Sequence, residues 1–296
     1  PDKRTAMEKI EDLIGYAQIK EELKRLLRSA VYRQADGSGA QFVPETLHWV
    51  LMGNPGTGKT TIAKLVGQVY KECGLLSKGH LVKATRSDLV AGYEGQTASK
   101  TRRMIEKAMD GILFIDEAYS LVKGAGQGGG FGTEAIAELV EAMSDRNGEF
   151  AVIAAGYPDD MEEFLKNNSG LRSRFKVFVL EDYTPAELHQ ILTLKCREAN
   201  FKLAPQLDEK LDLFFSNYKG RESKRRTWAN GREAENLLRS MQHEWFANPV
   251  IEEDPDGRKH RILTELHMPK ELLRYLKGRK MEDRNKESAQ ESIRMM

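Results

Sequence analysis

The chain has 296 residues, enough for one large domain or two smaller ones. Its 46 lysines and arginines nearly balance its 45 aspartates and glutamates, so the overall charge gives no indication of a nucleic-acid partner or a membrane surface. The apolar runs are too short for a membrane span, which needs about 20 residues. We interpret the two cysteines, Cys73 and Cys196, as reduced structural thiols, which favours a cytoplasmic location or the equivalent stroma or matrix of an organelle.

The first predicted elements are a helix, a strand and a second helix. Apolar residues recur at helical spacing over Ala17–Gln34, and Asp36–Gly39 ends this pattern. The apolar run Leu47–Met52 predicts a strand, and Thr61–Cys73 again has helical spacing. A strand and a helix joined by a glycine-rich segment form the setting in which a nucleotide phosphate loop occurs.

The segment that joins this strand to this helix fits the pattern G-x-x-x-x-G-K-[ST], whose backbone wraps nucleotide phosphates. The residues expected to bind nucleotide here are Gly53, Asn54, Pro55, Gly56, Thr57, Gly58, Lys59, Thr60 and Thr61. Glycines allow tight turns that point N–H groups at phosphate oxygens, and the following helix presents its positive end to the same anion. We expect Lys59 to reach the β- and γ-phosphates and the Thr60 hydroxyl to hold Mg²⁺.

A second motif, Ile112–Glu117, combines an apolar run with two carboxylates. Its four apolar residues predict a strand buried on both faces, as in a parallel sheet. At the carboxyl edge of that sheet, Asp116 is expected to hold Mg²⁺, directly or through water, and Glu117 to polarise the water that attacks the γ-phosphate. Alone, the pattern also fits the solvated start of a loop, but the phosphate loop upstream favours the catalytic interpretation.

Strands and helices alternate over residues 1–182. The other predicted elements are strands at His80–Thr85, Phe150–Ala155 and Phe175–Leu180 and helices at Ser99–Met109 and Thr133–Ser144. This alternation predicts an α/β fold whose five-stranded parallel sheet is covered on both faces. Together with the phosphate loop, it indicates a P-loop NTPase domain. The segment Gly124–Gly132 holds six glycines and is expected to be a mobile loop.

The pattern changes after Asp182, where no further strand is predicted. Thr184 has the character of a capping residue, with Pro185 in the first turn and Glu187 three positions on, so a helix is expected to begin there. Helical spacing recurs in three later segments, Leu207–Tyr218, Arg232–Ala247 and Pro269–Leu276. Residues 183–278 are therefore predicted to form a small all-helical domain, and the charged tail, residues 279–296, is expected to be disordered.

The phosphate loop, the Ile-Asp-Glu strand end and the trailing helical domain together resemble the AAA+ ATPases. Further stretches are similar to the CbbX/stage V sporulation protein K subgroup, which includes red-type Rubisco activases and ATPases of type VII secretion. These stretches are Lys78–Val82, Gly92–Thr97, Leu113–Tyr119, Ala155–Tyr157 and Gly170–Phe175. The resemblance implies that the helical domain is an AAA+ lid. It also implies a ring, usually a hexamer, that uses ATP to remodel a protein partner.

The resemblance implies roles for three residues outside the nucleotide loop. Tyr93 matches the aromatic residue of the central pore loop, where a ring of aromatic side chains would grip an extended polypeptide; a half-buried loop tyrosine is the alternative. Its neighbour Glu94 replaces the aliphatic residue that relatives tend to carry. Arg174, and as second choice Arg172, match the arginine finger that a neighbouring subunit supplies to the γ-phosphate.

Four further residues match the family's nucleotide sensors and its adenine pocket. Arg232 follows Gly231 at a helix start and resembles the sensor-2 arginine, which contacts the γ-phosphate from the lid. Tyr157 occupies the sensor-1 position, where many AAA+ proteins have an Asn that orients the attacking water; a phenol also donates a hydrogen bond, but with a different reach. Ile14 and Gly15 look like the corner that contacts adenine, with core packing as the alternative.

These observations predict a Mg²⁺·ATP-dependent ATPase of the AAA+ type that forms a ring and threads or remodels a protein partner of unknown identity. One alternative is a nucleotide-switched protein-binding module that does not thread its partner. The other is a nucleic-acid motor, against which the near-neutral charge argues. The basic run Lys219–Arg226 is interpreted as a solvated loop.

Overall fold

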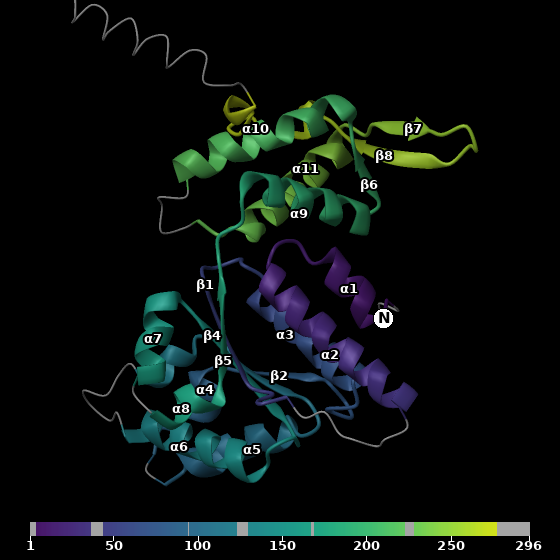
Figure 1. The fold of residues 1–296 in the computed structure, drawn as a ribbon. Coiled ribbons are helices and arrows are strands. Elements are labelled where there is room, and N and C mark those ends of the chain that lie inside the picture. Colours follow the sequence, from purple (N-terminus) through teal and green to yellow (C-terminus); the bar gives the residue numbers. More distant parts are fainter. Residues whose placement is uncertain are drawn as a thin grey trace, which may run out of the picture. The chain divides into compact units, whose positions relative to one another are not determined.

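A computed structural model gives the structure of residues 4–36, 44–93, 95–122, 130–166, 169–222 and 228–276 (Figure 1). The chain divides into two compact units, Pro1–Asp182 and Tyr183–Met296. Several predictions fall outside the described residues: those for Glu94, most of Gly124–Gly132, part of the basic run (Ser223–Arg226) and the tail, residues 279–296. No helix in the described parts of the chain is long and apolar enough to cross a lipid bilayer.

The first unit is built around a five-stranded parallel sheet. Its strands are β1 (Trp49–Gly53), β2 (Leu81–Ala84), β3 (Ile112–Ile115), β4 (Ala151–Gly156) and β5 (Lys176–Leu180), in the spatial order β2-β3-β4-β1-β5. Each neighbouring pair is parallel. Every strand overlaps the segment predicted for it, so the predicted fold class, an α/β domain of the P-loop type with five parallel strands, is confirmed.

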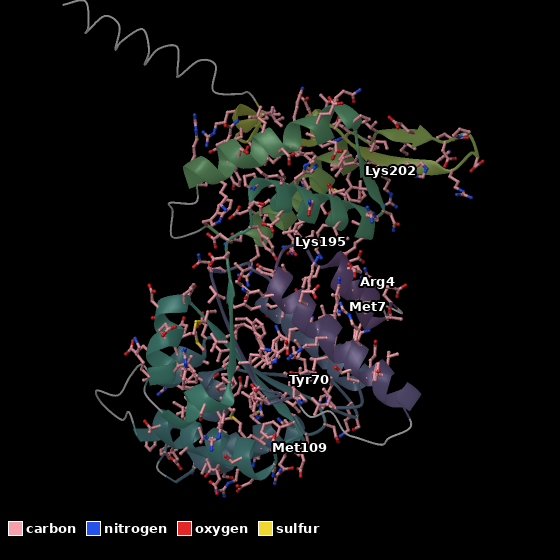
Figure 2. All side chains as sticks on the ribbon, viewed as in Figure 1. Arg4, Met7, Tyr70, Met109, Lys195 and Lys202 are labelled. Carbon is pink, nitrogen blue, oxygen red and sulfur yellow. The ribbon has the colours of Figure 1, made fainter. Side chains whose placement is uncertain are left out.

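The sheet is covered on both faces because successive side chains of a strand point to opposite sides. Trp49 and Leu51 join a core formed with α1 (Ala6–Asp12), α2 (Ala17–Asp36) and α3 (Lys59–Glu72). Val50 and Met52 join a second core on the other face, where the helices are α4 (Arg86–Leu89), α5 (Thr97–Lys107), α6 (Gly130–Asp145), α7 (Pro158–Lys166) and α8 (Ser169–Arg174). Tyr70 of α3, labelled in Figure 2, lies in the first core and donates its hydroxyl to the Leu47 carbonyl at 3.1 Å.

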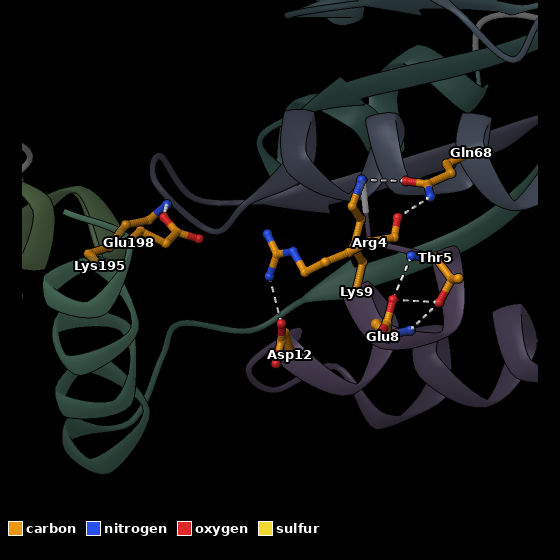
Figure 3. Close-up of polar contacts among 8 residues, drawn as sticks. All are labelled: Arg4, Thr5, Glu8, Lys9, Asp12, Gln68, Lys195 and Glu198. Carbon is orange, nitrogen blue, oxygen red and sulfur yellow. Dashed lines mark hydrogen bonds and ion pairs between the residues drawn. The ribbon is translucent and has the colours of Figure 1, made fainter. Parts of the chain in front are cut away.

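Polar contacts at its amino end fasten α1 to α3 (Figure 3). Thr5 caps α1 in a capping box with Glu8, because each side chain accepts the backbone N–H of the other. From α3, the Gln68 amide donates to the Arg4 carbonyl at 3.0 Å and accepts from Nζ of Lys9 at 2.7 Å. These contacts hold α1 directly before the corner that is predicted to contact adenine.

Two glycines let α3 approach the segment before β2. A Cβ at Gly67 would overlap the Gly79 carbonyl, and a Cβ at Gly79 would overlap the Gly67 carbonyl.

We expect Gly67→Ala to lower the free energy of unfolding by about 1–3 kcal/mol, since the backbone of α3 or of Gly79 has to move to make room for the added methyl group. Gly220→Ala in α10 (Pro205–Glu222) is the matched control: no atom lies within 4 Å of its added Cβ, so alanine should stabilise that helix by roughly 0.5–1 kcal/mol. Urea unfolding of both variants measures the difference, and a Gly67→Ala protein as stable as the wild type would contradict this packing.

The second unit is mainly helical. Its long helices are α9 (Pro185–Glu198), α10 and α11 (Gly231–Ala247). The capping box predicted for α9 is confirmed: Oγ1 of Thr184 accepts the Glu187 N–H at 3.2 Å, and Oε2 of Glu187 accepts the Thr184 N–H at 2.8 Å. The predicted helical lid is thus confirmed in outline.

The prediction that no strand follows Asp182 is wrong. Strands β6 (Phe201–Leu203), β7 (Ile251–Glu253) and β8 (Lys259–Leu263) form a small sheet in the order β6-β8-β7, so the unit is not entirely helical. These strands have three to five residues and β7 is exposed throughout, so the sequence contains neither a long apolar run nor a buried alternation to mark them.

Two helix predictions also need correction. Over Pro269–Leu276 the structure has only a short 3₁₀ turn, Leu273–Tyr275. Tertiary contacts with α10 hold this segment: the Tyr275 ring packs against Phe214, and its hydroxyl donates to Oε1 of Glu222 at 2.7 Å. Helix α6 begins at Gly130, so the last residues of the predicted glycine loop are helical. A Cβ at Gly132 would overlap the Leu121 carbonyl, and glycine is therefore required by packing at this point.

Candidate active site

Parallel strands bring the predicted catalytic and phosphate-binding residues to one edge of the sheet. Gly53, Ile115 and Gly156 end β1, β3 and β4, and the register of these strands places their carboxyl ends together. The phosphate loop follows Gly53, Asp116 follows Ile115, and Tyr157 follows Gly156. Ligands of open α/β sheets bind outside the carboxyl ends of the strands, so this edge is the candidate active site.

The phosphate loop closes around its own lysine. Nζ of Lys59 donates to the Gly53 carbonyl at 2.7 Å and to the Asn54 carbonyl at 2.8 Å. Oγ1 of Thr57 donates to the same Asn54 carbonyl at 2.8 Å. The backbone turns at Gly56 and Gly58, whose φ angles of 75° and 82° lie in the left-handed region that favours glycine. The ammonium group therefore lies at the loop, where phosphate oxygens can replace the two carbonyls.

The loop also fits the rest of a nucleotide phosphate site. A Cβ at Gly53 would lie 2.8 Å from Oγ1 of Thr57 and 2.9 Å from the Leu180 carbonyl, so only glycine allows this approach. Helix α3 begins at Lys59, which leaves Thr60 and Thr61 in its first turn, where backbone N–H groups have no helical partner. The predicted Mg²⁺ ligands, Thr60 and Asp116, supply hard oxygen atoms of the kind that this ion prefers.

The two carboxylates differ in their surroundings. Asp116 is half-buried, and its backbone N–H donates to the Ala84 carbonyl at 3.0 Å. Glu117 is exposed and has φ 51° and ψ 46°, in the left-handed region. Such a conformation costs roughly 1–3 kcal/mol for a residue other than glycine and is concentrated at functional sites. The Glu117 N–H donates to Oδ1 of Asp116 at 3.2 Å, so this strained turn connects the two acids directly.

Tyr157 pairs with a residue to which the sequence assigned no role. Its ring lies 5.9 Å from that of Tyr119, and a Cβ at Gly156 would lie 2.8 Å from Tyr119 Cδ1. Burial, with the Glu117 carboxylate as the next cause, raises the pKa of Tyr119 to about 12, so the phenol stays protonated. Tyr119 lies in the stretch Leu113–Tyr119, which resembles the subgroup, and this position was the signal in the sequence that could have identified it. Asp182 was also missed; its Oδ1 accepts the Asn54 amide at 2.9 Å.

Arg174 lies at the opposite edge of the sheet from the phosphate loop. It precedes β5, whose five residues span about 16 Å at 3.3 Å each, whereas the loop lies beyond the carboxyl ends. Its Nε and Nη2 donate to Oγ of Ser144 at 3.0 and 2.7 Å, and Nη1 donates to the Gly170 carbonyl at 2.9 Å. Arg172 is exposed and forms no hydrogen bond or ion pair with the described residues.

His48 lies close to Arg174 and is uncharged. Its Nδ1 accepts the Val152 N–H at 2.9 Å, which fixes the ring inside the protein. Burial lowers the pKa of His48 to about 4, with the Arg174 charge as a further cause in the same direction. A neutral imidazole next to the guanidinium avoids repulsion between two cations.

The remaining predicted site residues are placed as follows. Ile14 and Gly15 are half-buried after α1, and Gly15 has φ 73°. Tyr93 follows α4 and is 75% exposed. Arg232, in the second unit, is the second residue of α11; its side chain is exposed and forms no hydrogen bond or ion pair with the described residues of that unit.

Comparisons with known proteins agree with this geometry. Residues 49–182 match the sequence model of the ATPase family associated with various cellular activities (AAA), and residues 184–264 match the AAA lid domain. Stage V sporulation protein K of Bacillus subtilis (strain 168) is 40% identical over 228 residues, which cover 76% of this chain and 70% of that protein. The chain belongs to the AAA family of ATPases.

Two further relatives place this AAA ATPase in its subgroup. Protein CbbX of Cereibacter sphaeroides is 35% identical over 229 residues, 77% of this chain and 72% of CbbX. The chloroplastic ribulose bisphosphate carboxylase/oxygenase activase of Cyanidioschyzon merolae is 35% identical over 229 residues, 77% of this chain and 76% of the activase. The resemblance to the CbbX/stage V sporulation protein K subgroup is confirmed, and the chain is a nucleotide-binding ATPase. The roles of its individual site residues stay predictions.

Proposed function

We propose that this AAA ATPase assembles into a ring, most simply a hexamer, and uses Mg²⁺·ATP to remodel or thread a protein partner through a central pore. The observation that supports this best is the position of Arg174, at the sheet edge opposite to the phosphate loop. An arginine so placed reaches a γ-phosphate only when the phosphate is bound to another copy of the chain. A head-to-tail contact of this kind closes into a ring if its rotation permits.

Within one copy, each residue at the site has a separate task. The loop N–H groups and Lys59 hold the phosphates, and Ile14 and Gly15 contact adenine. Thr60 and Asp116 would hold Mg²⁺, and the ion would supply positive charge that offsets the negative charge of the phosphates. Glu117 polarises the attacking water, and the Tyr157 phenol donates a hydrogen bond at the same strand edge. Arg232 contacts the γ-phosphate from the lid.

Arg174 completes the site of a neighbouring copy. A guanidinium has five N–H groups, and three of those of Arg174 donate to Ser144 and Gly170. One N–H on each terminal nitrogen remains for phosphate oxygens, which suits bidentate binding. Because the internal hydrogen bonds fix the group beforehand, little reorganisation is needed when charge develops on the γ-phosphate.

A protein is a better candidate for the partner than a nucleic acid. The chloroplastic relative from Cyanidioschyzon merolae is named as the activase of an enzyme, so at least one related ATPase acts on a protein. The near-balance of acidic and basic residues also argues against nucleic acid. Cys73 and Cys196 are both buried and neither is part of a disulfide, which supports a reducing compartment such as the cytoplasm.

Tyr93→Ala distinguishes threading from a nucleotide-switched binding module. A threading ring needs an exposed aromatic side chain to grip the polypeptide, so we expect the variant to keep ATPase activity within about twofold and to lose remodelling of its partner. Tyr32→Ala on α2 is the matched control, because Tyr32 is 77% exposed and Tyr93 75%. The readouts are phosphate release and ATP-driven unfolding of a partner trapped by the Glu117→Gln variant. Full remodelling activity in the Tyr93→Ala variant would favour the nucleotide-switched binding module.

Ring assembly has its own test. Glu117→Gln retains the groups that bind ATP, so this variant should form a closed oligomer at saturating Mg²⁺·ATP. Analytical ultracentrifugation of the full chain measures its mass. A well-folded protein that stays monomeric while it binds ATP would contradict the proposed ring.

A further inference from the structure

Tyr16 contacts the phosphate loop from outside the residues that the family motif names. It lies directly after the adenine corner, and its hydroxyl donates to the Thr57 carbonyl at 2.7 Å. The two residues are 41 positions apart in the chain, so this hydrogen bond joins the segment before α2 to the tip of the phosphate loop. The ring of Tyr16 is half-buried and packs against the core that includes α1, α2 and α3.

The backbone around Tyr16 is held in an unusual conformation. Gly15 and Tyr16 have φ 73° and 56°, so two consecutive residues lie in the left-handed region, and at Tyr16 this costs free energy. The Tyr16 carbonyl accepts the N–H of Lys20 at 3.0 Å in the first turn of α2. The side chain therefore starts from a fixed point and is directed at the loop.

The hydrogen bond to Thr57 sets the direction of the next N–H group. The described chain contains no cis peptide bond, so the carbonyl of Thr57 and the N–H of Gly58 point in opposite directions across one planar peptide. With the carbonyl bound to Tyr16, the Gly58 N–H is directed away from Tyr16. No acceptor among the described residues takes this N–H. It is one of the loop donors that the motif provides for phosphate oxygens.

We propose that Tyr16 is a positioning residue for nucleotide binding, which fixes the Thr57–Gly58 peptide so that the Gly58 N–H faces the phosphates. The inference rests on the proposed nucleotide site, because it concerns the same loop. It adds a connection: the segment that contacts adenine also orients a phosphate donor. The Gly58 N–H contacts the phosphates in the ground state and in the transition state alike. Loss of its fixed orientation therefore weakens nucleotide binding rather than slowing the chemical step.

Tyr16→Phe is the direct test, because phenylalanine fills the same space and lacks only the hydroxyl. Tyr70→Phe is the matched control: the Tyr70 hydroxyl also donates to a backbone carbonyl, that of Leu47, and Tyr70 lies in the same core but away from the loop. Calorimetric titration of the full chain with ADP gives the dissociation constants, and steady-state kinetics give kcat and KM for ATP.

We expect Tyr16→Phe to raise the dissociation constant for ADP and the KM for ATP by roughly three- to tenfold, with kcat within about twofold. Tyr70→Phe should leave all three within about twofold, although it loses a comparable hydrogen bond. Unchanged ADP binding by Tyr16→Phe, or equal weakening in both variants, would overturn the proposal. A wild-type chain that binds no ADP would instead contradict the nucleotide site itself.

Discussion

Glu117→Gln should lower ATP turnover by about 10²–10⁴-fold, the range that a positioned general base contributes, and should leave ATP binding intact. Glutamine has the shape of glutamate, but its amide does not polarise a water or accept its proton. Glu117 follows Asp116 just beyond the end of β3, in a strained left-handed turn, and its N–H donates to the Asp116 carboxylate. Phosphate release under saturating ATP measures turnover, and calorimetry measures binding.

Glu149→Gln provides the matched control for this substitution. Glu149 is exposed and lies before β4, at the amino edge of the same sheet, far from the phosphate loop. The same change of charge there should alter turnover by less than about twofold, since exposed carboxylates remote from a site contribute little. Near-normal turnover in Glu117→Gln would remove Glu117 from the mechanism.

Arg174→Ala should lower ATP turnover by about 10³–10⁵-fold, which is the factor that an arginine finger contributes to the rate of related phosphoryl transfers. The effect is large because the guanidinium is held by Ser144 and Gly170 before any phosphate is present. The variant should still bind ATP, because the residue lies at the opposite edge from its own phosphate loop. Steady-state kinetics measure the loss of ATP turnover, and titration with ADP measures whether nucleotide binding is retained.

Arg172→Ala is the natural comparison, since Arg172 is exposed and forms no hydrogen bond or ion pair with the described residues. We expect a smaller loss of turnover than for Arg174→Ala, because a free side chain loses conformational entropy when it binds phosphate. A larger loss for Arg172→Ala would reverse the assignment of the finger.

The sequence predicts the first unit well because its strands β1, β3 and β4 are buried on both faces. Ile112–Ile115, for example, is an unbroken apolar run, and such runs show both strand position and parallel pairing. The family motif then predicts the roles of the phosphate loop and of the Asp-Glu pair.

In the second unit, β7 is exposed and short, and Tyr275 is placed by contacts with α10. The local sequence pattern therefore carries no information about β7 or about the position of Tyr275.

Other features of the site depend on contacts between distant segments. The hydrogen bonds from Tyr16 to Thr57 and from Arg174 to Ser144 join residues 41 and 30 positions apart. Neither pair has a spacing or residue type that marks it in a single sequence. The motif thus predicts which residues bind nucleotide, whereas only the fold shows which side chains contact them.

The central claim is that one active site is completed by two copies of the chain, and mixing two inactive variants tests it most directly. Glu117→Gln keeps Arg174, and Arg174→Ala keeps Glu117, so in a randomly mixed ring roughly a quarter of the sites combine an intact base with an intact finger. The ATPase activity of the equimolar mixture should therefore rise far above that of either variant alone. Activity equal to the mean of the two separate variants, in oligomers shown to contain both, would contradict the shared site.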